Sequence, residues 1–202
     1  MQLTEVYLTV GMPGEAELIA QRHLETNKNP ELRRVLALAL SGQRKFNEAA
    51  EELKAICAEH PDQILAYEAL GQLIEQRPND FLDTPAYWFN QAVEVNPSSA
   101  LAYIIRASFY LRKRDVNEAL ADLQRAEKCD LSDPTVRLRL AQGLINANLL
   151  DKAEEHLAVV HQAMPKNQSL WQTWARLALR SQSREKMLEI AETGLKELSS
   201  EP

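Results

Sequence analysis

The chain has 202 residues, of which 45% are hydrophobic and 26% charged, as in an ordinary globular protein. Its net charge of −6 argues against a nucleic-acid-binding surface, which needs a positive excess. No stretch reaches the ~18 apolar residues of a membrane span. Cys57 and Cys129 are too few and too far apart for a disulfide framework. The composition, with only six glycines, favours helix throughout.

The first ten residues have neither a basic flank nor a long apolar core, so they do not resemble a secretory signal. We therefore expect a cytoplasmic protein. The pattern from Leu3 to Val10 is typical of the middle of a helix, however, so the chain could be part of a longer protein. A periplasmic or other compartment would then remain open. Residues 15–29 follow as the closing helix of a truncated helix pair.

From residue 30 onwards the sequence repeats with a period of 34 residues. The positions Pro61, Pro97, Leu131 and Pro165 are separated by steps of 36, 34 and 34. A single two-residue insertion between Pro61 and Pro97 explains the unequal step. We expect the insertion to lengthen a turn around residues 78–84.

Each period contains two apolar patterns of helical spacing, separated by a polar turn. In residues 100–133 the first pattern is Tyr103, Ala107 and Tyr110. The second pattern is Ala119, Leu123 and Ala126. Such a helix pair cannot bury its apolar face alone, so neighbouring pairs must stack on it.

These residues resemble the tetratricopeptide repeat, which carries aromatic, small and proline residues at fixed places in a 34-residue helix pair. Tyr67, Leu70, Gly71 and Phe89 match the same pattern, whereas Arg106 replaces an expected leucine. The resemblance implies an all-α, right-handed α-solenoid of stacked antiparallel helix pairs, with about five repeats. It implies one domain over 1–202: a partial or capping repeat at 1–29, repeats at 30–63, 64–99, 100–133 and 134–167, and a C-terminal repeat or cap at 168–202.

No motif of a catalytic site is present: the chain lacks a glycine-rich phosphate loop, GxSxG and HExxH. His156 and His161 are five residues apart and cannot face one metal from one helix, so we interpret them as surface histidines. We predict no enzyme activity, no catalytic residue, no metal site and no cofactor.

The resemblance also implies a binding groove lined by the first helix of each pair. Carried over to this sequence, the groove residues are Leu65, Glu68, Gln72, Leu101, Ile104, Ile105, Ser108, Arg112, Leu138, Arg139, Gln142, Asn146, Gln172, Arg176 and Arg180.

The character of these groove residues changes along the chain from acidic to apolar to basic. Residues 1–101 carry 8 Lys/Arg against 15 Asp/Glu, whereas residues 102–202 carry 15 against 14. Arginines at this density suit carboxylate or phosphate groups. Two alternatives remain open: the arginines pair with neighbouring acids, and adjacent helices cover Ile104 and Ile105.

The segment 80–97 holds four of the chain's twelve aromatic residues. Phe89 fills a core position, and Thr84 with Pro85 can start a helix. Phe81, Tyr87 and Trp88 then lie on the outer side of the helix pair. We expect Phe81 and Leu82 to fold over Tyr87 and Trp88 as a local plug; a second contact surface is the alternative.

The sequence therefore predicts a non-catalytic protein–protein interaction scaffold whose groove binds a peptide or protein segment, with acidic residues as a possible feature of the partner. Nucleic acid and membrane insertion are not expected. Two other functions stay open: a regulatory or targeting domain of a larger enzyme, and a structural protein that self-associates through its terminal repeats.

Overall fold

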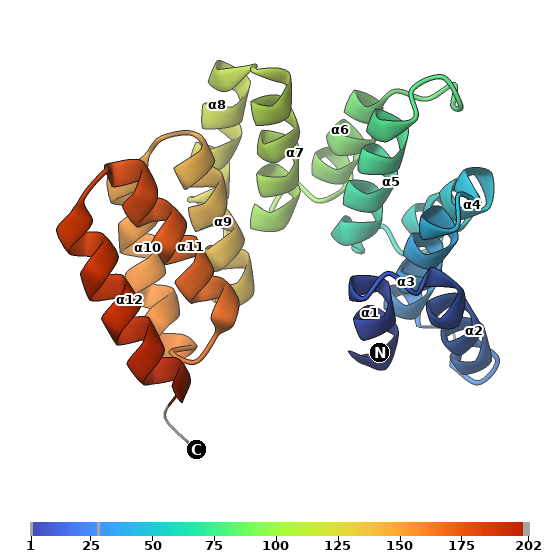
Figure 1. Ribbon diagram of the computed structural model, residues 1–202. Helices are drawn as coiled ribbons and strands as arrows, with labels where there is room; N and C mark the ends of the chain where they lie inside the picture. The colour runs from blue at the N-terminus through green and yellow to red at the C-terminus, as the bar shows by residue number, and fades with distance from the viewer. Residues whose placement is uncertain (1, 28, 200–202) are drawn as a thin grey trace. The chain divides into compact units, whose positions relative to one another are not determined.

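The computed structural model describes residues 2–27 and 29–199, which form twelve α-helices and no β-strand (Figure 1). The helices are α1 (Gln2–Thr9), α2 (Pro13–Leu24), α3 (Pro30–Gly42), α4 (Phe46–Glu59), α5 (Ile64–Gln76), α6 (Pro85–Val95), α7 (Ala100–Lys113), α8 (Val116–Ala126), α9 (Pro134–Asn146), α10 (Leu150–Ala163), α11 (Gln168–Ser181) and α12 (Arg184–Ser199). Parts of the two predicted terminal repeats, residues 1, 28 and 200–202, lie outside the described residues. Of the helices described, none is both long and apolar enough to cross a membrane.

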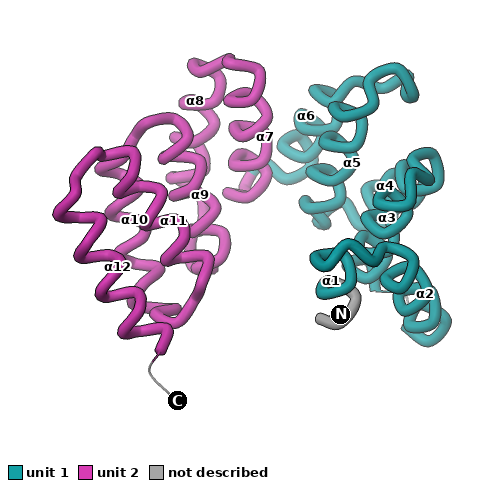
Figure 2. The backbone as a smooth tube through the Cα atoms, viewed as in Figure 1, with its two compact units in different colours: residues 1–97 teal, residues 98–202 magenta. Residues whose placement is uncertain are grey.

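The chain divides into two compact units, residues 1–97 (unit 1) and residues 98–202 (unit 2) (Figure 2). Within each unit every helix packs against the next one along the chain. The odd-numbered helices also contact one another, α1 with α3 and α3 with α5 in unit 1, and α7 with α9 and α9 with α11 in unit 2. Each unit is thus a stack of helix pairs, which confirms the predicted α-solenoid class. We call the odd-numbered helix of each pair its first helix.

The spacing of the first helices follows the period in the sequence. They begin at Pro30, Ile64, Ala100, Pro134 and Gln168, so the steps are 34, 36, 34 and 34 residues. The longer step contains the connection between α5 and α6, where the insertion was expected. This connection runs from residue 77 to residue 84.

Side-chain caps start four of the five first helices from α3 onwards. Asn29, Ser99, Asp133 and Asn167 each accept a hydrogen bond from a backbone N–H in the first turn of α3, α7, α9 and α11. Thr84 caps α6 in the same way, accepting from the Tyr87 N–H at 3.3 Å, with Pro85 next to it as predicted. Because a cap satisfies an otherwise unpaired backbone donor, the sequence itself sets where each of these helices begins.

The core of unit 2 contains the small residues that the repeat pattern predicted to lie between helices. Ala107, Ala119 and Ala126 are fully buried, and Leu123 is buried with them. In unit 1 Gly71 allows an equally close approach, since a Cβ at this position would lie 2.7 Å from the ring of Phe89. Small residues at these places let the two helices of a pair pack closely.

Candidate peptide-binding surface

The first helices of unit 2 differ in charge from the helices that pair with them. Together α7, α9 and α11 carry seven basic residues and no acidic residue. The seven are Arg106, Arg112, Lys113, Arg137, Arg139, Arg176 and Arg180. The acidic residues of unit 2 between residues 98 and 199 lie instead on α8, α10, α12 and the connecting turns. One layer of this unit is therefore uniformly cationic, although the net charge of the whole chain is negative.

Arg106 and Arg137 form hydrogen bonds inside unit 2 that join helices and turns. Arg106 donates from Nε and from one terminal nitrogen to the carboxylate of Asp122 on α8, at 2.7 and 2.8 Å. Arg137 donates from Nε to the backbone carbonyl of Leu131 at 3.1 Å. These two arginines hold helices and turns together.

Arg176 and Arg180 lie one turn apart on α11, with exposed side chains. Neither forms an ion pair or a hydrogen bond with another residue that the structure describes. The alternative that neighbouring acids neutralise them therefore does not hold within the described residues. Two guanidinium groups with free donors are available to a ligand.

A hydrogen bond joins α9 to α11 beside these arginines. Gln142 donates to the hydroxyl of Thr173 at 3.1 Å, and this hydroxyl in turn donates to the backbone carbonyl of Ser169 at 2.7 Å. Arg139 lies one turn from Gln142, and Arg176 lies one turn from Thr173. The arginines of the two helices therefore occupy neighbouring turns. We call Arg139, Arg176 and Arg180, with the flanking amides of Gln142, Asn146 and Gln172, the basic face.

The apolar centre of the predicted groove is not on the surface. Ile104 and Ile105 on α7 are 3% and 1% exposed, and Leu138 on α9 is 5% exposed. Ile104 and Leu138 belong to the core of unit 2, where their apolar side chains are buried between packed helices. These three residues are not available to a ligand. The other predicted positions on α7 remain accessible, with Leu101 and Ser108 half-buried and Arg112 exposed.

In unit 1 the predicted residues Leu65, Glu68 and Gln72 are all half-buried on α5. Gln72 donates to Glu68 at 3.4 Å and lines a small pocket between α3 and α5 of about 70 Å³. This volume accommodates an atom group rather than a whole side chain.

The aromatic segment after α5 differs from the expected plug. Leu82 is fully exposed and Tyr87 is 49% exposed, so Leu82 does not cover Tyr87. Phe81 and Trp88 are half-buried. Trp88 packs edge-on against Tyr87, and its ring lies 5.8 Å from Nζ of Lys54, which pairs with Asp83 from the long connection. The connection reaches Trp88 through this ion pair and not through Leu82.

The sequence suggested that the two histidines of α10 are surface residues, and the structure differs from this interpretation. His156 and His161 are both half-buried. The His161 ring lies 5.2 Å from the ring centre of Trp171 and 5.4 Å from that of Trp174. The pattern of a single helix did not show this arrangement, because the partners of His161 come from another helix.

No family model and no curated protein matches this sequence. Solved structures do match. A thermophilic tetratricopeptide-repeat protein of Thermus thermophilus is 22% identical, with a TM-score of 0.61 over 91% of this chain and 97% of the other. YrrB, described as a tetratricopeptide-repeat protein with an unusual peptide-binding site, is 18% identical, with a TM-score of 0.51 over 88% and 91%. PilW, a type IV pilus biogenesis factor, is 17% identical, with a TM-score of 0.58 over 88% and 81%.

The helix pairs, their 34-residue spacing and these structural matches define the class of the protein as a helical-repeat solenoid. Its fold is that of the tetratricopeptide-repeat proteins.

Proposed function

We propose that this protein is a non-catalytic interaction scaffold, and that the basic face of unit 2 binds an acidic peptide or protein segment. The observation that carries the proposal is the charge of α7, α9 and α11, which hold seven basic residues and no acidic residue. The unpaired guanidinium groups of Arg176 and Arg180 supply the donors. A cytoplasmic location remains a prediction from the sequence.

Carboxylates suit this face because a planar guanidinium group presents paired N–H donors that match the two oxygens of Asp or Glu. The amides of Gln142, Asn146 and Gln172 can hydrogen-bond the peptide backbone between the charged contacts. The structural matches include a protein described as having a peptide-binding site, which agrees with this role.

The proposal is tested by changing Arg139, Arg176 and Arg180 together to Gln, which removes charge and keeps most of the bulk. The probe is a fluorescein-labelled peptide rich in Glu and Asp, and its binding is followed by fluorescence anisotropy. We expect the triple variant to bind the peptide ~2–4 kcal/mol more weakly if the arginine–carboxylate pairs are desolvated in the complex. If these pairs stay hydrated, the loss of affinity should be smaller. Added salt should weaken the wild type and hardly affect the variant.

The matched control changes three exposed basic residues outside the basic face, Arg114, Lys128 and Arg184, to Gln. This variant has the same net charge as the test variant, so it should retain wild-type affinity if location matters. A second control is the same peptide with Gln and Asn in place of its acids, which should not bind. Equal affinity of the two triple variants would show that the basic face is not the site.

Self-association is a second candidate function. Leu179, Leu195 and Leu198 are exposed and line an apolar pocket of about 360 Å³ between α11 and α12. In helical repeats such a face is normally covered by the next repeat, and a second copy of the chain would cover it here. Light scattering over a concentration series should then show a dimer that Leu195→Glu dissociates. A monomer at every concentration would eliminate this candidate.

A further inference from the structure

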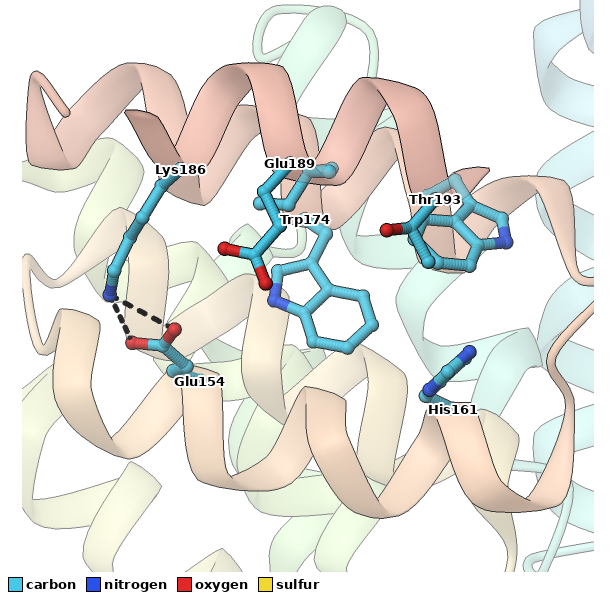
Figure 3. Close-up of a pocket in the computed structure, with 8 residues that line it drawn as sticks. Glu154, His161, Trp174, Lys186, Glu189 and Thr193 are labelled. Carbon is cyan, nitrogen blue, oxygen red and sulfur yellow. Dashed lines mark hydrogen bonds and ion pairs between the residues drawn. The ribbon is translucent and has the colours of Figure 1, made fainter. Parts of the chain in front are cut away.

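A pocket of about 240 Å³ opens between α10 and α12, with α11 behind it (Figure 3). Of these three helices only α11 also contributes to the basic face. It is lined by Glu154, His161, Trp171, Trp174, Lys186, Glu189, Ile190 and Thr193. Its volume fits one amino-acid side chain or a small organic ion. All of its residues lie in unit 2.

Three aromatic rings form one wall of the pocket. Trp171 and Trp174 are stacked, with ring centres 5.4 Å apart and an angle of 29° between the planes. The His161 ring meets both indoles at steep angles of 76° and 66°. Indole faces carry a concentration of negative charge, and tryptophan is the side chain that attracts organic cations most strongly.

The pocket carries a net negative charge, with two carboxylates against one ammonium group, and the Lys186 ammonium also attracts Glu189 electrostatically. Lys186 donates to Glu154 at 2.6 Å and so neutralises it at one end of the pocket (Figure 3). Glu189 lies on the next turn of α12 after Lys186 and points toward the indole of Trp174 (Figure 3). Glu189 is exposed and has no ion pair or hydrogen bond with another residue that the structure describes. A negative charge therefore stands beside the aromatic wall.

The wall also contains a polar atom without a partner. Nε2 of His161 is buried and neither accepts nor donates a hydrogen bond among the described residues. Buried polar atoms are nearly always paired, since leaving one unpaired is unfavourable. A ligand that brings an N–H donor, with a small turn of the ring, would satisfy this nitrogen.

We propose that this pocket binds an organic ammonium group. The half-buried indole of Trp174 would hold the cation and its alkyl carbons, and Glu189 would supply the counter-charge. An anion would meet a pocket with two carboxylates and one ammonium group, whose net charge repels it. A neutral apolar group would gain the aromatic contacts but no charge pairing. The ammonium group can come from a lysine side chain of a partner protein or from a free amine.

This proposal is independent of the basic face, because the two sites select ligands of opposite charge. A partner segment that presents both acids and a lysine could engage both. A negative result for one site would therefore not contradict the proposal for the other.

The test uses the full chain and three probes: N-acetyl-lysine methylamide, tetramethylammonium, and N-acetyl-norleucine methylamide as the neutral counterpart of the lysine derivative. Two-dimensional NMR follows the three indole N–H signals. We expect saturable shifts of the Trp171 and Trp174 signals with at least one of the two cations. The Trp88 signal, from unit 1, serves as an internal reference and should not move. Preference for the lysine derivative indicates a protein side chain, and preference for tetramethylammonium indicates a small free ammonium ion held by the aromatic contacts without a hydrogen bond to His161.

Glu189→Gln should weaken binding of the preferred cation about three-fold or more. Its matched control is Glu192→Gln, an exposed carboxylate on the same helix that does not line the pocket. Both substitutions are at exposed positions and keep the fold. Binding of the norleucine derivative as tight as that of the lysine derivative would overturn the proposal, as would equal effects of the two variants or the absence of saturable shifts.

Discussion

At the scale of single residues, Arg106 shows how a departure from the repeat pattern is accommodated. The resemblance places a leucine at this position, and the structure places an ion pair there. The carboxylate of Asp122 is 1% exposed and also accepts a hydrogen bond from Arg125 at 2.7 Å. Hydrogen bonding to Asp122 raises the pKa of Arg106. Two residues of opposite charge on α7 and α8 thus replace an apolar contact.

Asp122→Ala should destabilise the protein by about 3–5 kcal/mol, because it leaves the half-buried charge of Arg106 without its carboxylate. Urea unfolding followed by circular dichroism measures the loss. Glu118→Gln, at an exposed acid of the same helix, should change stability little. The double variant Arg106→Leu/Asp122→Leu should recover much of the loss. A single Asp122→Ala variant as stable as the wild type would contradict this role.

His156 links the stability of unit 2 to pH. Burial in the first place, and then the nearby Arg137 cation, lowers the pKa of His156 from 6.5. Glu127, whose carboxylate is 3.8 Å from Nε2, acts in the opposite direction and does not reverse the shift. Below pH 6.5 the unfolded chain therefore binds the proton more readily than the folded chain does.

We predict that the free energy of unfolding decreases as the pH falls from 6.5 through the folded-state pKa of His156, and that this residue has no such effect at higher pH. His156→Gln should flatten the dependence in this window, measured by urea unfolding at a series of pH values. His23→Gln, at an exposed position on α2, is the control and should leave the slope unchanged. A wild-type slope in the His156 variant would assign the effect to other groups.

At the scale of helices and turns, one backbone conformation recurs between the two helices of a pair. Arg44, Arg114, Asn148 and Gln182 all have positive φ, between 55° and 67°. Each lies one or two residues after the first helix of its pair, and 34 residues after Arg44 the corresponding position is Pro78. Proline cannot adopt a positive φ, so the tight turn is excluded there. This gives a physical reason for the longer connection after α5.

Arg114→Gly should raise the free energy of unfolding by about 0.5–1 kcal/mol, because glycine adopts this conformation without steric cost. Arg114 is exposed, so the substitution removes no packing. Asn148→Gly should have a smaller effect, since asparagine already tolerates the left-handed region. Thermal unfolding of the two variants measures the difference. A less stable Arg114→Gly variant would mean that the arginine side chain contributes more than the strain costs.

At the scale of the whole molecule, stability depends on the contacts between helix pairs, because no pair can bury its apolar face alone. The recurring alanines Ala49, Ala119 and Ala153 are all fully buried. Because protein interiors are closely packed, a larger or charged side chain at these positions would displace its neighbours.

Ala119→Asp should destabilise unit 2 by several kcal/mol, through overpacking and a buried unpaired charge. Hydrogen exchange should show the loss of protection mainly in residues 98–202, with a smaller change in residues 1–97. Ala121→Asp, at a half-buried position of the same helix, is the control and should cost less. Near-native protection in the Ala119 variant would mean that this position is not a contact between helices.

The candidate binding residues show where prediction from the repeat pattern stopped. Arg139, Arg176 and Arg180 could be placed from their positions in the repeat, because the free side of a first helix follows from its apolar side. Ile104, Ile105 and Leu138 could not be excluded in this way. Whether an apolar side chain on that side is covered depends on the neighbouring helix and on the volume it leaves. Local spacing contains no information on either.

The sequence by itself determined the helices, their period, the cap at Thr84 and the place of the insertion. All of these depend on interactions within a few residues, or on a period that the chain repeats. Only the tertiary structure decided that Arg106 pairs with Asp122, that Leu138 is buried, and that His161 meets Trp171 and Trp174. These outcomes depend on side chains brought together from different helices, and the packing distances that select them are set only when the helices stack.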